Sequence, residues 1–280
     1  MNPDLDRLQP YPFQRLAQLF HAIIPDQGYK PINLHIGEPK HPAPQFIRDA
    51  LSANLSGLSS YPVTAGSVAL RKSIADWLAS RYGLPEPDIK TQILPLNGSR
   101  EALFAFAQAV IDRTRPNPVV VCPNPFYQIY EGAALLAGAT PCFLNTVPDD
   151  LFRLDFSQLD DSVWQRTQLV YVCSPGNPHG HVMAIDEWQT LFELSDRYGF
   201  IIAADECYSE IYSGTPPLGS LQAACQSGRT DYRNLVMFSS LSKRSNVPGL
   251  RSGFVAGDAK ILEKFSLYRT YHGCAMNPAV

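Results

Sequence analysis

From residue 91 onward, short apolar runs alternate with longer amphipathic segments. The runs are rich in Val, Ile, Leu and Phe, and the expected strands are 91–96, 117–122, 140–144, 168–173, 199–205, 234–240 and 252–257. Helical periodicity appears in segments 99–112, 126–138, 186–198 and 258–271. Strands that are apolar along their whole length and alternate with helices indicate a sheet covered on both faces. The sequence therefore predicts an α/β fold with a mostly parallel sheet flanked by helices and joined by right-handed crossovers.

The first 90 residues follow a different pattern. Residues 44–57 and 66–82 have the periodicity of two amphipathic helices. Residues 1–40 contain several prolines and one short strand-like piece at 32–36, "INLHI". We therefore expect residues 1–40 to be an arm that is distinct from the sheet-forming part of the chain.

Composition excludes several classes of function. The net charge is −3 over 280 residues, which gives no basic surface for nucleic acid. The N-terminus is acidic and proline-bearing, unlike a signal peptide, and no apolar run is long enough to span a bilayer. Six cysteines are scattered without a C-x-x-C pair. The sequence predicts a reduced, cytoplasmic protein with no membrane or nucleic-acid partner.

Polar residues follow the expected strands, at the sheet edge where ligands of α/β folds bind. Asn97, Gly98 and Ser99 follow the first strand and open a helix. A helix N-terminus that begins with small residues can bind an anion through its free N–H groups. An ordinary helix cap, formed by the side chain of Asn97 or Ser99, is the alternative interpretation.

The later strands are followed by an aromatic ring, an amide, a carboxylate, a phenol, a lysine and an arginine: Tyr127, Asn177, Asp205, Tyr208, Lys243 and Arg251. Each has an ordinary structural explanation, such as a core aromatic or a turn asparagine. Together they supply what pyridoxal phosphate needs: a phosphate grip, a ring stack, partners for the ring nitrogen and oxygen, and a lysine. The order of these residues therefore predicts a pyridoxal phosphate site.

The motifs that carry this site also resemble a known family. Segments "NGSREALF", "SPGNPHG", "DECYSEIY" and "SSLSKRSNVPGLRSG" are similar to the class I/II aminotransferases, which are fold-type-I pyridoxal phosphate enzymes. The similarity extends over essentially the whole chain. Within the family, the sequence of residues 123–140 and 239–258 is most similar to that of the N-succinyldiaminopimelate aminotransferases of bacterial lysine biosynthesis.

The resemblance implies a role for each matching residue. Lys243 would be the covalent anchor of the cofactor and the group that moves the substrate proton, and Asp205 would keep the pyridine nitrogen protonated. Asn177 and Tyr208 would donate to the ring oxygen, while Tyr127 would stack on the ring. The phosphate would be held by residues at the start of the helix, Gly98, Ser99 and Arg100, and by residues of the segment around the lysine, Ser240 and Arg251.

The resemblance also implies contributions from outside the sheet. Gly37 would let its backbone approach the substrate carboxylate. Tyr61 would reach the phosphate of a neighbouring subunit, so the expected partner is a second copy in a homodimer. Residues 1–40 would belong to a small domain and residues 41–280 would form the cofactor-binding large domain.

The chain departs from the family pattern in two places. The family's usual N-P-T-G or N-P-S-G is N-P-H-G here, where His179 and His181 flank Gly180. We expect no metal site there, because carboxylate and cysteine partners at ligand spacing are missing. We also expect the C-terminal small domain, with its arginine for the substrate α-carboxylate, to be absent. Phe13, Leu16, Leu19 and Phe20 of the arm should then be poorly covered, and activity should be reduced.

The expected activity is amino transfer between N-succinyl-LL-2,6-diaminopimelate, or a similar acylated diamino acid, and 2-oxoglutarate. A C–S lyase or decarboxylase of the same fold is one alternative, because the cofactor-binding residues would be shared. A non-catalytic module that binds pyridoxal phosphate is another. A nicotinamide dehydrogenase is disfavoured because no G-x-G-x-x-G follows any expected strand.

Overall fold

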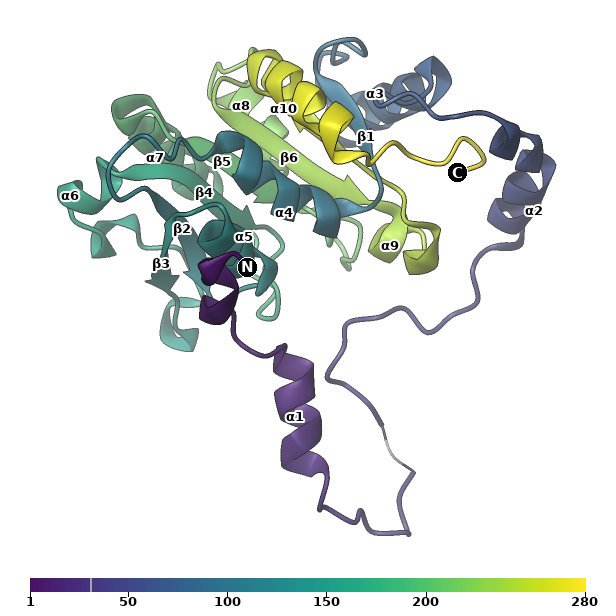
Figure 1. Ribbon diagram of the computed structural model, residues 1–280, viewed down its shortest axis with the longest axis horizontal. Coiled ribbons are helices and arrows are strands. Elements are labelled where there is room, and N and C mark those ends of the chain that lie inside the picture. The colour runs from purple at the N-terminus through teal and green to yellow at the C-terminus, as the bar shows by residue number, and fades with distance from the viewer. Residues whose placement is uncertain (31) are drawn as a thin grey trace.

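A mixed sheet of seven strands forms the centre of the computed structural model, which describes residues 1–30 and 32–280 (Figure 1). The strand order is β1-β7-β6-β5-β4-β2-β3. The strands are β1 (Ile93–Leu96), β2 (Val119–Asn124), β3 (Thr140–Asn145), β4 (Thr167–Cys173), β5 (Ile201–Asp205), β6 (Leu235–Ser240) and β7 (Gly253–Gly257). Each of the seven runs that were expected to be strands from residue 91 onward is one.

Strand direction follows the expected mostly parallel pattern with one exception. β2 to β6 pair in parallel, whereas β7 is antiparallel to both of its neighbours, β6 and β1. The reversal brings the beginning of β7 beside the ends of β1 and β6. Leu96 and Ser240 both pair with Gly253 there.

Helices cover both faces of the sheet. The α-helices are α1 (Pro12–Phe20), α2 (Gln45–Ala53), α3 (Val68–Tyr82), α4 (Ser99–Val110), α5 (Ile129–Leu136), α6 (Asp161–Trp164), α7 (Ile185–Tyr198), α8 (Ser220–Gln226), α9 (Leu241–Arg244) and α10 (Ala259–His272). Helices α3, α7 and α8 pack on one face, and α4, α5 and α10 pack on the other. None of the helices in the described ranges is both long and apolar enough to cross a membrane.

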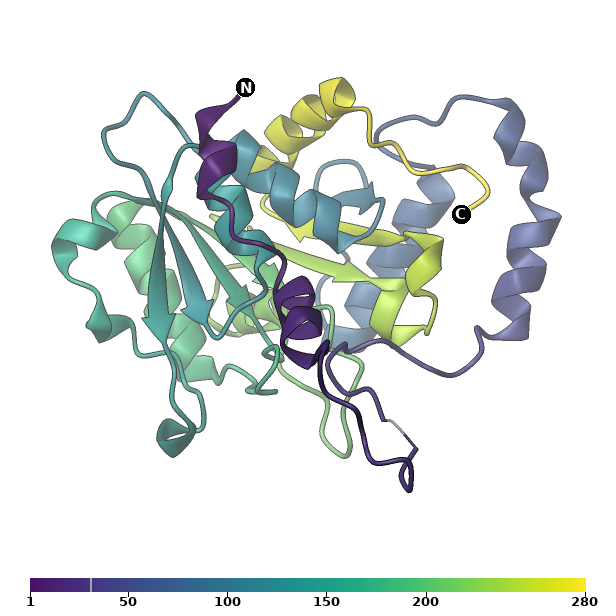
Figure 2. The same ribbon diagram turned by 60° about the horizontal axis from the view of Figure 1, so that its bottom comes forward.

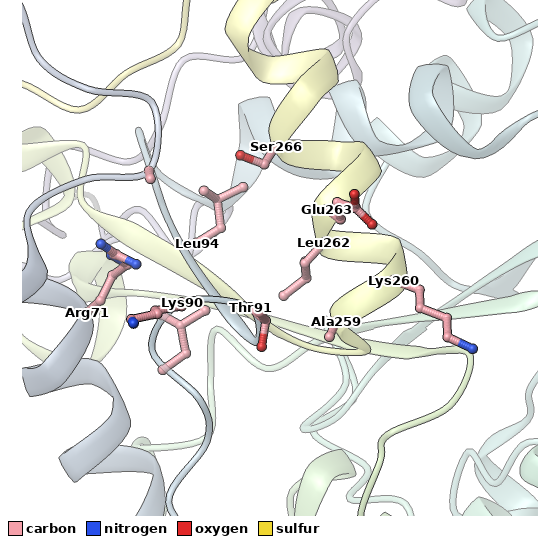
Figure 3. Close-up of a pocket in the computed structure, with 11 residues that line it drawn as sticks. Arg71, Lys90, Thr91, Leu94, Ala259, Lys260, Leu262, Glu263 and Ser266 are labelled. Carbon is pink, nitrogen blue, oxygen red and sulfur yellow. The ribbon is translucent and has the colours of Figure 1, made fainter.

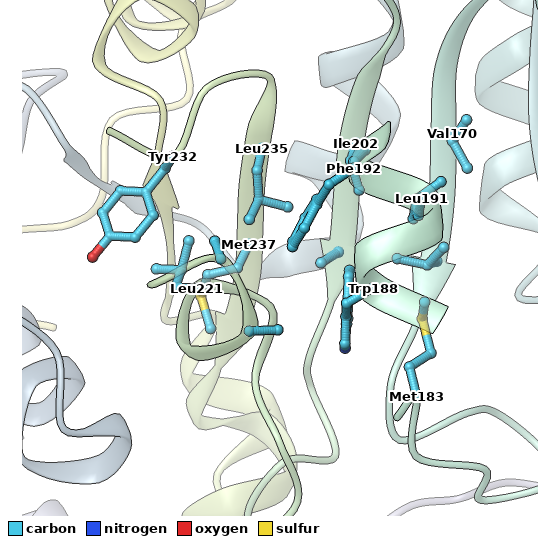
Figure 4. Close-up of a cluster of buried hydrophobic side chains, with 14 of the residues drawn as sticks. Val170, Met183, Trp188, Leu191, Phe192, Ile202, Leu221, Tyr232, Leu235 and Met237 are labelled. Carbon is cyan, nitrogen blue, oxygen red and sulfur yellow. The ribbon is translucent and has the colours of Figure 1, made fainter. Parts of the chain in front are cut away.

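The two faces of the sheet each have their own core. In β4, Val170 contributes to the core under α7, whereas Tyr171 contributes to the core under α4 and α5. Figure 4 shows Trp188 and Phe192 of α7 lying over the strands that carry Val170 and Ile202. Because both faces of these strands are buried, their sequences are apolar without interruption.

The N-terminal part differs from its prediction. Residues 32–36 are not a strand, and an unexpected helix, α1, precedes them. In Figure 1, α1 and the described residues just after it project from the body of the molecule, and in Figure 2 the loop after α1 extends below that body. Leu19 is 73% exposed and Phe20 56%, as expected for a poorly covered arm. Phe13, however, is half-buried because it packs beside Tyr11 and His35, and Leu16 is half-buried too.

Candidate active site

One edge of the sheet gathers the polar residues that the sequence pointed to. β1, β4, β5 and β6 end at this edge, and β7 begins there. The register places Cys173 beside Asp205, and Asp205 beside Phe238. The segments that follow these strands therefore leave the sheet side by side, which brings their polar side chains into one region.

The N-terminus of α4 has no side-chain cap. Gly98 is the residue before the helix, with φ +84°, and no described side chain accepts from the first-turn N–H groups. The Asn97 amide instead donates to the carbonyls of Cys274 and Ala275, at 3.1 and 3.2 Å. The interpretation of Asn97 or Ser99 as a cap is therefore wrong. The uncapped N–H groups and the positive end of the helix dipole are available to an anion.

Arg251 lies directly against this helix start. Its guanidinium donates to the carbonyl of Pro248 at 2.8 Å and to that of Asn97 at 3.4 Å. A Cβ on Gly98 would lie 2.0 Å from Nη2 of Arg251. Glycine at position 98 therefore leaves the space that the guanidinium fills. A cation with unused donors beside an uncapped helix start makes a site for a phosphate group.

Two serine hydroxyls meet at a cysteine beside the same place. The Cys207 thiol lies 3.0 Å from the Ser99 hydroxyl and 3.6 Å from the Ser240 hydroxyl. Ser99 and Ser240 were expected to act together, and the structure brings them to one point. Cys207 was not assigned a role, although it stands between Asp205 and Tyr208 in the sequence.

Arg100 has different partners from Arg251. Its guanidinium donates to the Tyr127 hydroxyl and, at 3.1 Å, to the Tyr11 hydroxyl. Both phenol oxygens raise the pKa of Arg100 against the opposing effect of burial. Arg100 therefore contributes to the helix start through its backbone N–H, in the first turn of α4, and its side chain binds the two phenols instead.

Asp205 is a buried carboxylate held by neutral donors. It is 5% exposed, and it accepts hydrogen bonds from the Tyr130 hydroxyl at 2.8 Å and from the Cys207 N–H at 3.2 Å. No cation among the described residues pairs with it. Burial raises the pKa of Asp205, and the hydrogen bonds oppose that rise. A buried carboxylate that lacks a cationic partner can pair with a cationic group of a ligand.

Tyr130, which donates to Asp205, is, after Cys207, a second residue of the site that the sequence did not reveal. Its ring stacks on Tyr171 at 4.6 Å, and both rings are buried in the core under α5. The available signal was its spacing from Tyr127, since residues three apart in a helical turn lie on the same side. Tyr127 and Tyr130 indeed lie edge to face, with ring centres 5.8 Å apart.

Lys243 lies in the short helix α9, where a loop was expected. The half-buried amine donates to the carbonyl of Gly37 and lies 6.0 Å from the centre of the Tyr208 ring. Burial lowers the pKa of Lys243, and the nearby charge of Arg100 lowers it further, whereas Cys207 and Glu38 oppose the shift. A lowered pKa increases the share of neutral amine, which is the nucleophilic form.

Gly37 and Tyr208 complete this group. A Cβ on Gly37 would lie 3.7 Å from the Tyr208 hydroxyl, so the arm backbone closely approaches the phenol. Asn177 is half-buried in the turn between β4 and α7. Tyr61 is not brought to the site within one chain, because its side chain is fully exposed, at 101%.

The residues present fit pyridoxal phosphate. The uncapped start of α4, with Arg251 beside it, matches a phosphate group. Asp205 is buried and lacks a cation, which matches a protonated ring nitrogen. Lys243 has a lowered pKa, which matches an amine that reacts with an aldehyde.

Two cavities lie away from this site, toward the opposite edge of the sheet. One, of about 360 Å³, lies between α3, β1 and α10, and Arg71, Leu94 and Leu262 are among its lining residues (Figure 3). Another, of about 700 Å³, is lined by residues such as Phe106 and Phe265. Neither includes a residue that was expected at the active site.

One group in the described chain has the composition of a metal site: Glu101, His272 and Cys274. Arg269, whose side chain is buried, pairs with Glu101 at 2.8 Å and so already supplies a positive charge there. His179 and His181 belong to no such group among residues 1–30 and 32–280.

The comparisons with known proteins agree on one family. The pattern of "Aminotransferase class I and II" matches residues 29–270. An LL-diaminopimelate aminotransferase of Aquifex aeolicus is 30% identical over 266 residues, covering 94% of this chain and 66% of that protein. Another with the same name, from Desulforudis audaxviator, is 32% identical and covers 91% of this chain and 64% of that protein. The chain thus spans about two thirds of the length of these relatives.

Solved structures agree with the sequence matches. The crystal structure of an aminotransferase from Neisseria meningitidis superposes with a TM-score of 0.95 at 55% identity, covering 100% of this chain and 71% of that chain. The aminotransferase AspB from Helicobacter pylori superposes with a TM-score of 0.91 at 38% identity, covering 97% and 71%. The expected fold is therefore confirmed by chains that carry the same architecture.

Proposed function

The chain belongs to the class I and II aminotransferases, and on that premise we propose that it acts as a pyridoxal-phosphate-dependent transaminase. Members of this family use pyridoxal 5′-phosphate. The observation that carries the proposal is the presence of a half-buried lysine, Lys243, and a buried carboxylate, Asp205, at the ends of the neighbouring strands β6 and β5. Both stand at the edge where the uncapped start of α4 offers a phosphate site.

We propose that each part of the cofactor has its own set of residues. The phosphate group is held by Gly98, Ser99, Arg100, Ser240 and Arg251, with Arg100 contributing its backbone N–H. The ring would stack on Tyr127, its nitrogen would face Asp205, and its oxygen would accept from Asn177 and Tyr208. The close contacts of Arg251 with Gly98 and of Cys207 with both serines support the phosphate assignment.

The protein's own part in the reaction is to hold charges and to move a proton. When bound, the cofactor supplies an electron sink for the substrate's α-carbon. Asp205 would face the ring nitrogen and favour its protonated form, and that cation would in turn favour the ionised carboxylate, which burial alone disfavours. The Lys243 amine would take the proton from the substrate's α-carbon and deliver it to the C4′ carbon of the cofactor. Gly37 leaves room for the substrate carboxylate beside the lysine.

The substrate that we propose is a diaminopimelate-type amino acid, with 2-oxoglutarate as the amino acceptor. Two relatives are named for LL-diaminopimelate, while the wording of 123–140 and 239–258 resembles enzymes for its N-succinyl derivative. In the first substrate the distal amine is free and cationic, whereas in the second it is a neutral amide that carries the anionic carboxylate of the succinyl group. Electrostatic recognition of the distal end therefore decides between them.

An amino-donor screen tests the function and separates the alternatives. LL-diaminopimelate, its N-succinyl derivative and common amino acids would be offered with 2-oxoglutarate as acceptor, and glutamate formation would be measured. A transaminase forms glutamate in proportion to the donor consumed. Consumption without an acceptor would indicate a C–S lyase or decarboxylase. Cofactor binding without consumption of any donor would indicate a binding module.

We further propose that the chain acts as a homodimer and that Tyr61 contributes to the partner's site. Its complete exposure within one chain supports this assignment. Residues 1–40 are proposed to belong to a small domain, and residues 41–280 to the large one. Replacing Tyr61 by Phe tests the shared site: in a homodimer, cofactor affinity should fall although Tyr61 lies outside the site of its own chain.

A further inference from the structure

The imidazole ring of His179 packs against both Phe152 and the backbone of the loop that carries Asn177. Its ring stacks on Phe152, with ring centres 4.9 Å apart and planes 14° from parallel. On another side it lies over Gly176, where a Cβ would come within 2.0 Å of the imidazole Cε1. Gly176 immediately precedes Asn177, so the ring fills the inside of the turn that aims the amide.

Two backbone hydrogen bonds and one bond from a backbone N–H to a side chain close this turn. The Gly176 N–H donates to the His181 carbonyl and the Gly180 N–H donates to the Gly176 carbonyl, both at 2.8 Å. The His181 N–H donates to Nδ1 of His179 at 3.1 Å. The third bond requires an unprotonated Nδ1, because a protonated Nδ1 is a donor and cannot accept.

Only a few charged groups face His179. The ring of His181 lies 6.3 Å away, and its Nε2 is 3.0 Å from the Glu187 carboxylate. Glu187 also accepts from the N–H groups of Ala184 and Leu154, and Arg153 lies 3.8 Å from it. Within the described chain, no carboxylate contacts the His179 ring itself to stabilise a positive charge.

We propose that neutral His179 is a positioning residue for Asn177, and that its protonation loosens the Asn177 turn and weakens cofactor binding in acid. This inference rests on the proposed function, since Asn177 is assigned to the cofactor's ring oxygen. His179 occupies the position where the family pattern has threonine or serine, neither of which titrates.

The direction of the pH effect follows from the environment of the ring. Burial, with a smaller contribution from His181, lowers the pKa of His179 below its ordinary value of 6.5. The folded turn therefore prefers the neutral ring. Its stabilisation is complete above pH 6.5 and is lost as the pH falls through the lowered pKa.

The test compares the protein with its His179→Asn variant. The Asn Oδ1 can accept from the His181 N–H in place of Nδ1, but it does not titrate. The dissociation constant of pyridoxal phosphate would be measured by absorbance from about pH 8 to about pH 5, the range in which histidine titrates. Between these limits, that constant should rise about 2- to 10-fold more for the unaltered protein than for His179→Asn, the equivalent of one hydrogen bond.

A matched control addresses the neighbouring histidine. His181→Gln keeps an N–H donor for Glu187 and leaves the His179 ring in place. It should retain the acid sensitivity of the unaltered protein. Equal acid sensitivity in the unaltered protein and in His179→Asn would overturn the proposal.

A second readout needs no cofactor. Hydrogen exchange of the Gly176, Gly180 and His181 amides, corrected for the pH dependence of intrinsic exchange, would be followed in the cofactor-free protein. Protection should fall in acid in the unaltered protein but persist in His179→Asn. Unchanged protection in both, or lost protection without any change in cofactor affinity, would contradict the positioning role. If no cofactor bound at any pH, the proposed function would fail, while the exchange data would still decide whether His179 holds the turn.

Discussion

The hydroxyl of Tyr130 donates to Oδ2 of Asp205 across 2.8 Å, and both residues are buried. Asp205 lies at the end of β5, while Tyr130 comes from α5 on one face of the sheet. The bond fixes the carboxylate without neutralising it. The buried charge therefore stays available for a cation that a ligand brings.

Replacing Tyr130 by Phe should leave Asp205 with one fewer donor. The free energy of unfolding should fall by about 1.5–3 kcal/mol, the usual contribution of a hydrogen bond to a charged group. The pKa of Asp205 should rise further, and cofactor affinity should fall with it. Tyr171→Phe is the matched control, because it removes a buried bond to the Leu103 carbonyl, at 2.6 Å, without touching Asp205. Equal cofactor affinity in the two variants would argue against a role for Tyr130.

Replacing Asp205 by Asn should keep the fold and abolish most turnover. The amide has nearly the same shape, but it cannot hold the cofactor's ring nitrogen protonated. Rates of amino transfer by the variant and the unaltered protein would be compared at saturating cofactor. A variant that works at nearly the unaltered rate would show that Asp205 has only a structural role.

Replacing Gly98 by Ala should weaken phosphate binding. The added Cβ would collide with the Arg251 guanidinium, and φ at this position is +84°. Displacing a charged phosphate ligand should raise the dissociation constant for pyridoxal phosphate at least about tenfold, which corresponds to about 1.4 kcal/mol.

Gly83 provides the control for backbone strain. It ends α3 with φ +63°, and a Cβ there would meet nothing within 4 Å. Gly83→Ala should lower stability by about 1 kcal/mol without changing cofactor affinity. If Gly98→Ala behaved in the same way, the phosphate would have to bind elsewhere.

Replacing Lys243 by Ala should remove both the covalent anchor and the proton carrier. Turnover should fall at least about 10²–10⁴-fold, the usual contribution of a positioned acid or base alone. The absorbance of the lysine-bound cofactor should disappear from the titration. If that absorbance persisted, another amine would be the anchor.

The sequence predicted all seven strands, most of which are unbroken apolar runs because both faces of the sheet are buried, as in Val119–Val121; β3, at the side of the sheet, is only partly buried. It did not predict that β7 runs antiparallel between β1 and β6, since strand order depends on contacts between distant segments. The strand-like piece at 32–36 does not form a strand, for a related reason. Its alternating apolar residues, such as Ile32 and Leu34, have no neighbouring strand and are 80% and 87% exposed.

Residues of the candidate site were predictable where they follow strands directly, as Asp205 and Lys243 do. Tyr130 and Cys207 were missed because their roles arise from contacts across the fold rather than from a motif. The capping interpretation of Asn97 failed because its amide is used by the distant carbonyls of Cys274 and Ala275. No local pattern around residue 97 contains that information.

The most direct test of the account asks which amine reacts with the cofactor. The protein would be mixed with pyridoxal phosphate, reduced with borohydride, digested and analysed by peptide mass spectrometry. One dominant modified site is expected, Lys243, whose half-buried amine has a lowered pKa, with little modification of exposed lysines such as Lys90 and Lys260. Equal labelling of the exposed lysines, or an unmodified Lys243, would contradict it.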